Sequence, residues 1–423
     1  MEEGSGTVAI SDSNRVKSSR VEALDGIRAY AILGIVAVHL LGVSGVLDRA
    51  DGTDLGVFIW GLLGSTVDAF FMISAFVLFI PAVRRGGEFG GAVSFWIKRG
   101  ARLFPALWLV LAITLVLAIV HPPLPGYTLP GPGEIFGNFA ALQMPAAFVS
   151  AGFRIGFGIN GPLWLVSVVV GFYAVLPFVA KAYYRHALIG LAIAALITVC
   201  WKEVIGRDPE LLLPFTNGDV ARIQLLGVDQ LPSWAFSLGL GMTGAWAYVR
   251  ANERWSREHL QRFATLALPV ALLLYVIAGY VRGRYALDFG GNVPVVARSH
   301  PFETLFESFS RAALIAVVVI GPFWMQRPFA NRPTARLSEL SYGIYLIHYV
   351  VILYVADLFD LPRAGTFGDF LIWTAVILPP SLAFSYASRR WVELPVIARV
   401  KAWQTRRDGN DTAPIHVPAA AAD

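Results

Sequence analysis

The stretch "LDGIRAYAILGIVAVHL", residues 24–40, carries an ionisable ring deep inside an otherwise apolar run. Its length and composition predict a membrane-spanning helix, since about 20 mostly apolar residues are needed to cross about 30 Å of hydrocarbon. Asp25 and Arg28 lie near the start of the run, whereas His39 follows fourteen positions after Asp25. An ionisable side chain inside a membrane is costly and is tolerated mainly beside a polar cavity or partner. The stretch therefore predicts a membrane fold and singles out His39.

The composition of the whole chain supports a membrane fold. Apolar residues make up 56% of the 423 positions and charged residues 15%, with a mean hydropathy of +0.61. These values are typical of integral membrane proteins and exclude an ordinary water-soluble domain. We expect an all-α protein with about ten transmembrane helices in a bacterial inner membrane. The ten apolar runs are 24–43, 57–82, 101–120, 162–180, 186–201, 230–249, 263–280, 305–325, 337–357 and 368–388.

Lysine and arginine are divided unevenly between the two sides of this predicted bundle. With a cytoplasmic amino terminus, the inner segments hold 24 of them and the outer loops 9, while Arg311 lies within a helix. The positive-inside rule then places both termini in the cytoplasm. Because the basic residues are spread among the loops, we expect the lipid bilayer as a partner and no nucleic acid.

The chain is expected to form one membrane domain with two short polar ends. We assign residues 1–20 to a polar cytoplasmic segment, 21–400 to the ten-helix domain and 401–423 to a disordered cytoplasmic tail. The single cysteine excludes an internal disulfide. Three outer loops are long and rich in Pro and Gly, which suggests that a bulky or polar molecule is recognised outside. These loops are 121–161, 202–229 and 281–304.

Arg28 and His39 define a polar track along the first helix. They are eleven residues apart, which returns to the same helix face within about 20° and separates them by about 16 Å along the axis. Histidine is the side chain whose pKa suits proton transfer near neutral pH. The alternative for His39 is a neutral ring that hydrogen-bonds to a neighbouring helix.

Two arginines mark the cytoplasmic start of the third helix. In "SFWIKRGARLFPALW", residues 94–108, Arg99 and Arg102 are three positions apart and share a helix face. Orientation alone would be served by any lysine, whereas paired guanidinium groups suit phosphates. The positive-inside rule and a site for a multiply phosphorylated cofactor account for this spacing about equally well.

Together these motifs resemble the acyltransferase 3 family of integral membrane acyl-CoA-dependent O-acyltransferases. The opening stretch has the family's basic residue, ten intervening positions and histidine, and Arg99 and Arg102 form its R-x-x-R pair. Four further stretches resemble family signatures in the expected order. They are "STVDAFFMISAFVLF" (65–79), "GPLWLVSVVVGFYAVLP" (161–177), "LSELSYGIYLIHYVV" (337–351) and "SYASRRWVELPV" (385–396).

The resemblance implies a donor, an acceptor and roles for particular residues. Cytoplasmic acyl-CoA would be the co-substrate, with no permanently bound cofactor and no metal. Its acyl group would pass to a hydroxyl of a carbohydrate, glycolipid or macrolide-like acceptor. His39 would be catalytic, and Arg28, the basic residue of the same motif, would bind acyl-CoA together with Arg99 and Arg102. Possible acceptor or supporting residues within these motifs are Trp164, Tyr173, Tyr345 and His348.

The sequence departs from the family where acidic residues usually stand, because Val169 and Val170 occupy those places. We predict that Asp68 orients His39 instead, since both residues lie about 21–22 Å from the cytoplasmic border. His348, at about 18 Å, is another ionisable group near that depth.

Because the sequence ends soon after the tenth helix, we expect it to lack the extracytoplasmic esterase-like domain of some relatives and to act as a stand-alone transferase or with a partner. The competing interpretation is a transporter or flippase of a glycolipid or similar envelope precursor.

Overall fold

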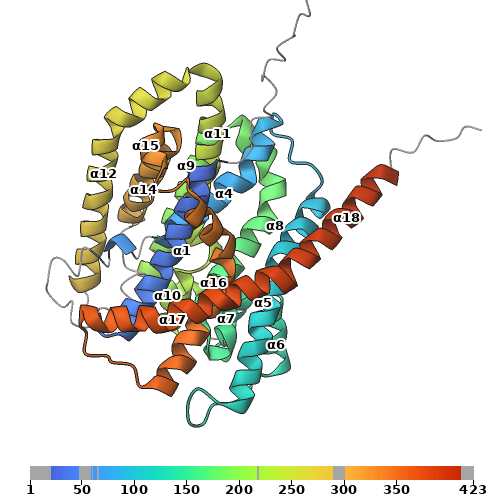
Figure 1. Cartoon of the computed structure of the whole chain (residues 1–423), viewed down its shortest axis with the longest axis vertical. Coiled ribbons are helices and arrows are strands. Elements are labelled where there is room, and N and C mark those ends of the chain that lie inside the picture. Colours follow the sequence, from blue (N-terminus) through green and yellow to red (C-terminus); the bar gives the residue numbers. More distant parts are fainter. Residues whose placement is uncertain are drawn as a thin grey trace, which may run out of the picture.

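The computed structural model describes residues 21–46, 59, 61–63, 66–216, 219–288 and 301–410. Within these ranges the protein is a bundle of helices without a β-strand, as the sequence predicts (Figure 1). The long helices are α1 (Glu22–Val43), α4 (Thr66–Arg84), α5 (Ala92–Val120), α8 (Trp164–Arg185), α9 (Ala187–Arg207), α11 (Ala235–Arg254), α12 (Arg257–Asp288), α14 (Pro301–Ile320), α16 (Arg332–Phe359), α17 (Phe367–Ser388) and α18 (Leu394–Asn410).

Each of the ten predicted apolar runs coincides with one of these helices, although the amino-terminal end of run 57–82 lies partly outside the described residues. Eight helical segments of the described chain are long and apolar enough to cross a membrane. The remaining two runs form α11 and α14, helices of 20 residues each. They are less apolar because α11 contains Gly, Ser and Arg, and α14 contains Glu303, Glu307 and Arg311. The chain is a multi-pass membrane protein.

Two helices extend beyond the predicted bounds. Helix α5 begins at Ala92, before the predicted apolar run 101–120, so Arg99 and Arg102 lie within the helix. Helix α18 continues to Asn410, so the predicted disordered tail begins as a helix, and residues 411–423 lie outside the described residues. The physical reason is packing, since α18 contacts α5 and the Gln404 amide donates to the Ser94 carbonyl at 3.3 Å.

The outer connections are folded as well as long. The loop predicted at 121–161 contains α6 (Pro132–Phe139), α7 (Gln143–Val149) and two 3₁₀ turns that lead into α8. The loop at 202–229 contains a 3₁₀ turn at Pro209–Phe215 and α10 (Val220–Gly227). Another 3₁₀ turn, at Leu231–Trp234, precedes α11, and the short α15 (Phe323–Gln326) follows α14. Figure 1 shows α6, α7 and α10 at one end of the bundle and α15 toward the other, so the two longer outer loops form a folded cap.

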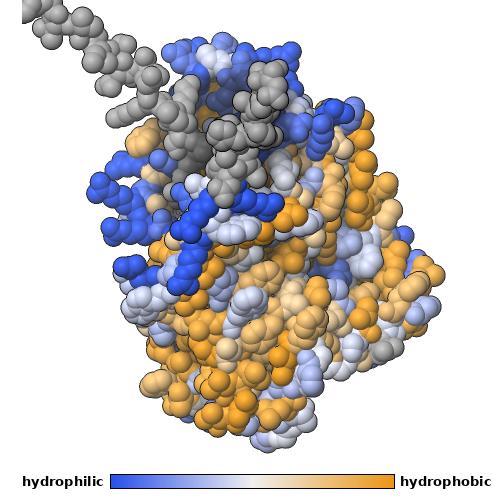
Figure 2. Space-filling model, turned by 90° about the vertical axis from the view of Figure 1, so that its right-hand side faces the viewer, coloured by the Kyte–Doolittle hydropathy of each residue, from blue (hydrophilic) through white to orange (hydrophobic). Residues whose placement is uncertain are grey.

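Close helix packing positions the interior. Helix α1 packs against α4 and α16, α4 against α11, α12 against α14, and α16 against α17 (Figure 1). Small residues permit these approaches, because a Cβ on Gly241 of α11 would overlap the backbone of Met72 in α4. Large apolar side chains such as Val120, Phe178 and Leu266 are instead exposed. Figure 2 shows a broad hydrophobic area on one face with hydrophilic residues gathered mainly above it, as expected for a surface in contact with lipid.

Candidate active site

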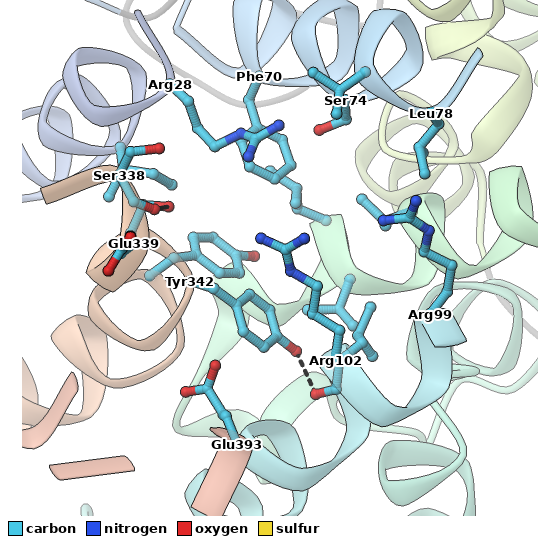
Figure 3. A pocket seen from close by; sticks show the side chains of 18 of the residues that line it. Arg28, Phe70, Ser74, Leu78, Arg99, Arg102, Ser338, Glu339, Tyr342 and Glu393 are labelled. Carbon is cyan, nitrogen blue, oxygen red and sulfur yellow. Dashed lines mark hydrogen bonds between the residues drawn. The ribbon is translucent and has the colours of Figure 1, made fainter. Parts of the chain in front are cut away.

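Three arginines from two helices converge on one cleft. Arg28 comes from α1, and Arg99 and Arg102 come from α5, with their side chains extending into the same space (Figure 3). The cleft encloses about 940 Å³, part of it open to solvent. None of the three arginines forms an ion pair within the described part of the chain, and the buried Nε atom of Arg99 has no hydrogen-bond partner there. Such a cluster suits an anionic ligand with several phosphate oxygens.

The opposite wall of this cleft comes from α16 and from the π-helical turn that joins α17 to α18. The turn spans Arg389–Glu393, and both of its end residues line the cleft. Arg389 pairs with Glu339 of α16 at 3.1 Å, and the hydroxyl of Tyr342 donates to the Leu103 carbonyl at 2.8 Å. A π turn often marks a functional site, because its extra residue redirects the side chains around it.

Sequence reasoning left these wall residues without a role. The stretches 337–351 and 385–396 were recognised as motifs, and that resemblance was the available signal. Val169, which stands where the family usually has an acid, also lines the cleft, together with the carboxylates of Glu339 and Glu393. The described cleft therefore does contain carboxylates, although they come from other helices.

His39 lies in a second, smaller cavity of about 420 Å³, here called the histidine chamber. Its walls include Thr66 of α4 and Trp164 at the start of α8. Leu165 and Tyr345 line both the chamber and the arginine cleft, so the two spaces adjoin.

His39 is paired with His348 of α16. The Nδ1 atom of His39 lies 3.0 Å from Nε2 of His348, and Nδ1 of His348 lies 2.7 Å from the Tyr345 carbonyl oxygen. A carbonyl only accepts, so Nδ1 of His348 carries the hydrogen and its Nε2 accepts from Nδ1 of His39 when both rings are neutral. This network leaves Nε2 of His39 without a proton, which is the form that a general base requires.

The other aromatic residues singled out from the sequence divide between the two spaces. Tyr173 lines the arginine cleft, whereas Trp164 lines the histidine chamber and stacks on Trp234 with ring centroids 5.6 Å apart. The hydroxyl of Tyr345 donates to the Pro162 carbonyl. This contact ties the entrance of α8 to α16 beside His348, so Tyr345 supports the chamber wall.

The predicted contact between His39 and Asp68 is wrong. The Asp68 carboxylate pairs with Arg311 of α14 at 2.5 Å and accepts hydrogen bonds from Ser237 and Ser308. Arg311 also contacts Glu307 at 3.3 Å, and its side chain is 3% exposed. A buried guanidinium requires a carboxylate partner, so Asp68 faces α11 and α14 and not α1. The prediction compared the depths of His39 and Asp68 along their helices, and depth does not specify which face of a helix a residue occupies.

Comparison with known proteins identifies relatives over most of the chain. Residues 21–390 match the family described as "Acyltransferase domain". The chain is 20% identical to the peptidoglycan O-acetyltransferase OatA of Listeria monocytogenes, covering 91% of this chain and 57% of the relative. It is 24% identical to the putative peptidoglycan O-acetyltransferase YrhL of Bacillus subtilis, covering 91% and 58%. It is also 24% identical to nodulation protein 10 of Rhizobium leguminosarum bv. viciae, covering 91% and 95%.

The chain belongs to the acyltransferase 3 family of membrane proteins. It spans a little over half the length of the OatA and YrhL proteins that it matches. No solved structure matches it.

Proposed function

We propose that this protein is an O-acyltransferase that takes an acyl group from cytoplasmic acyl-CoA and transfers it to an acceptor hydroxyl on the extracytoplasmic side. The observation that carries the proposal is the junction of the arginine cleft with the histidine chamber through Leu165 and Tyr345. Coenzyme A has phosphates at one end and a reactive thiol at the end of a long arm. The separation of Arg28 from His39, about 16 Å along α1, suits such a ligand.

In the proposed mechanism the three arginines hold the phosphates and the arm extends toward His39. Nε2 of His39 takes the proton of the acceptor hydroxyl while the hydroxyl oxygen attacks the thioester carbonyl carbon. The carbon–sulfur bond then breaks, and the coenzyme A thiolate leaves and takes up a proton. His348 acts through His39, because it accepts from Nδ1 and stabilises the imidazolium that forms, a role that a carboxylate has in hydrolase triads.

For the acceptor we propose a carbohydrate, glycolipid or macrolide-like molecule. The names of OatA and YrhL describe acetyl transfer to peptidoglycan by those proteins, which favours a carbohydrate hydroxyl. The folded outer connections cover the end of the bundle beyond the histidine chamber, where such a polar molecule would be met.

The test uses purified protein in lipid nanodiscs with acetyl-CoA and without an acceptor. A transferase is expected to release free thiol slowly by transfer to water, whereas a transporter is not. His39→Ala should abolish this release with coenzyme A binding nearly normal, because a general base contributes about 10²- to 10⁴-fold. Arg99→Ala combined with Arg102→Ala should mainly raise the KM for acetyl-CoA. Equal loss of coenzyme A binding in both variants would refute this division of roles.

A further inference from the structure

A third cavity lies on the side of α1 away from the arginine cleft. It encloses about 1800 Å³, including space open to the outside, between α1 and α4 on one wall and α12 and α14 on the other. Its lining is almost entirely apolar and includes Ala31, Ala37, Ala69, Leu272 and Leu314. We call this cavity the lateral groove.

The lateral groove adjoins the histidine chamber. Leu63 and Thr66 of the α4 side line both spaces, just as Leu165 and Tyr345 line both the chamber and the arginine cleft. The chamber therefore shares a wall with each of the other two spaces, on different sides of α1. A transferase with two substrates needs a second approach, because the donor fills the first one while its acyl group is at His39.

The rim of the groove faces lipid. Tyr30, Leu272 and Trp324 line the groove and are 47%, 44% and 58% exposed, and in a membrane domain such exposed apolar surface meets the acyl chains. Along α1 the lining runs from Ile27 to Ala37, a length of about 15 Å. An aliphatic tail is thus able to enter sideways from the bilayer.

We propose that the lateral groove binds the aliphatic tail of a lipid-linked acceptor, whose polar head then lies in the histidine chamber. This inference rests on the proposed function and specifies its acceptor class. With the arginine cleft on the cytoplasmic side, a tail in the groove runs from His39 toward the cytoplasm. A lipid whose polar head points outward has this orientation.

The donor's acyl chain fits the groove less well. It arrives from the arginine cleft, so it would have to pass His39, cross between α1 and α4 at Thr66, and turn back toward the cytoplasm. An acceptor lipid needs no such turn, because its tail enters from the rim while its head moves into the chamber.

The test is photolabelling in nanodiscs, with the crosslinked peptides mapped by mass spectrometry. One probe is dodecyl glucoside with a diazirine at the end of its tail, and the other is dodecanoyl-CoA with a diazirine at the same place. Leu272→Trp fills the groove from α12, and Ala69→Phe fills it from α4. Leu266→Trp is the matched control, since Leu266 is on α12, is 80% exposed and does not line the groove.

The glucoside probe should label the groove faces of α1, α12 and α14. This labelling should be lost in Leu272→Trp and in Ala69→Phe and kept in Leu266→Trp. Equal labelling on both faces of α12, labelling that survives both filled variants, or labelling of the groove by dodecanoyl-CoA in place of the glucoside would overturn the proposal. Binding requires no turnover, so groove labelling without thiol release from acetyl-CoA would contradict the proposed function alone.

Discussion

At the scale of single residues, the proposed chemistry depends on the pair of histidine rings formed by His39 and His348. His348 is fully buried, and the Tyr345 carbonyl accepts from its Nδ1 atom. That one backbone acceptor determines which nitrogen of His348 faces His39, and hence which nitrogen of His39 faces the chamber. Tyr349 adds an edge-on ring contact to His39, with centroids 5.3 Å apart.

Replacing His348 should therefore reduce turnover without affecting donor binding. In His348→Phe, Nδ1 of His39 loses its acceptor, and we expect kcat to fall on the order of 10²-fold because the base is no longer oriented. His348→Gln should restore part of the rate, since its amide oxygen also accepts. Thiol release from acetyl-CoA gives kcat and KM, with Tyr349→Phe as the control that keeps the ring. A raised KM with normal kcat in His348→Phe would contradict the positioning role.

The pair formed by Asp68 and Arg311 should affect stability instead. Asp68→Asn removes one of the two carboxylates that pair with the buried Arg311 and leaves only Glu307, which should cost about 1–3 kcal/mol and lower Tm. Replacing both residues, as Asp68→Leu with Arg311→Met, should recover most of the loss, because Glu307 still pairs with Arg282 at 2.8 Å. Fluorescence melting in detergent measures this. A normal Tm with slow turnover in Asp68→Asn would instead return Asp68 to the mechanism.

At the scale of helices, α1 and α16 form facing walls of one continuous site. On α1, Arg28 reaches the cleft and His39 the chamber. On α16, Ser338 lines the cleft and His348 contacts His39. Ten residues of helix separate Ser338 from His348, about 15 Å, which is close to the spacing on α1. The register between these two helices therefore decides whether both ends of the site work on one ligand.

Gly343 helps to set the position of α16. A Cβ at Gly343 would lie 2.9 Å from the Cβ and 3.0 Å from the Cα of Ser385 in α17. Gly343→Ala should therefore force the helices apart at a cost of about 1–3 kcal/mol and lower both Tm and kcat. Gly133→Ala is the matched control, because nothing lies within 4 Å of its added carbon. Equal Tm values for the two variants would show that the contact between Gly343 and Ser385 is not tight.

At the scale of the whole molecule, the two proposed substrates are assigned to opposite sides of α1. Arg28 lines the arginine cleft on one side of this helix, and Ala31 and Ala37 line the lateral groove on the other. The cleft and the groove meet only at the histidine chamber among the described cavities. Such a layout suits transfer across a membrane, because each substrate stays in the medium that dissolves it.

The predicted orientation is testable with single cysteines in a Cys200→Ala background. Gly133→Cys lies in the connection between α5 and α8, and Gly91→Cys precedes α5 at the opposite end. Both positions are exposed and have room for a side chain. From the distribution of Lys and Arg, an impermeant thiol reagent outside intact cells should label Gly133→Cys only. Labelling of Gly91→Cys in intact cells would reverse the orientation, and labelling in opened cells is the control for reactivity.

The sequence itself determines how far along its helix each residue lies. Apolar length and the rise per residue were enough to locate ten helices and to predict that Arg28 and His39 face the same way, about 16 Å apart. The motif at Arg99 and Arg102 also depends on local spacing. Residues three positions apart lie on the same helix face, so the pair indicates a phosphate site.

Which helix face meets which neighbour was decided only by the tertiary structure. Asp68 and His348 lie at similar depths, yet His348 contacts His39 and Asp68 binds Arg311. The two cases differ in the rotation and packing of helices that are far apart in the chain, and hydropathy along one helix carries no information on that. The cleft wall from the Arg389–Glu393 turn and the lateral groove also depend on such contacts. Local sequence therefore determines the axial level of a group, and the packing of distant helices determines its partner.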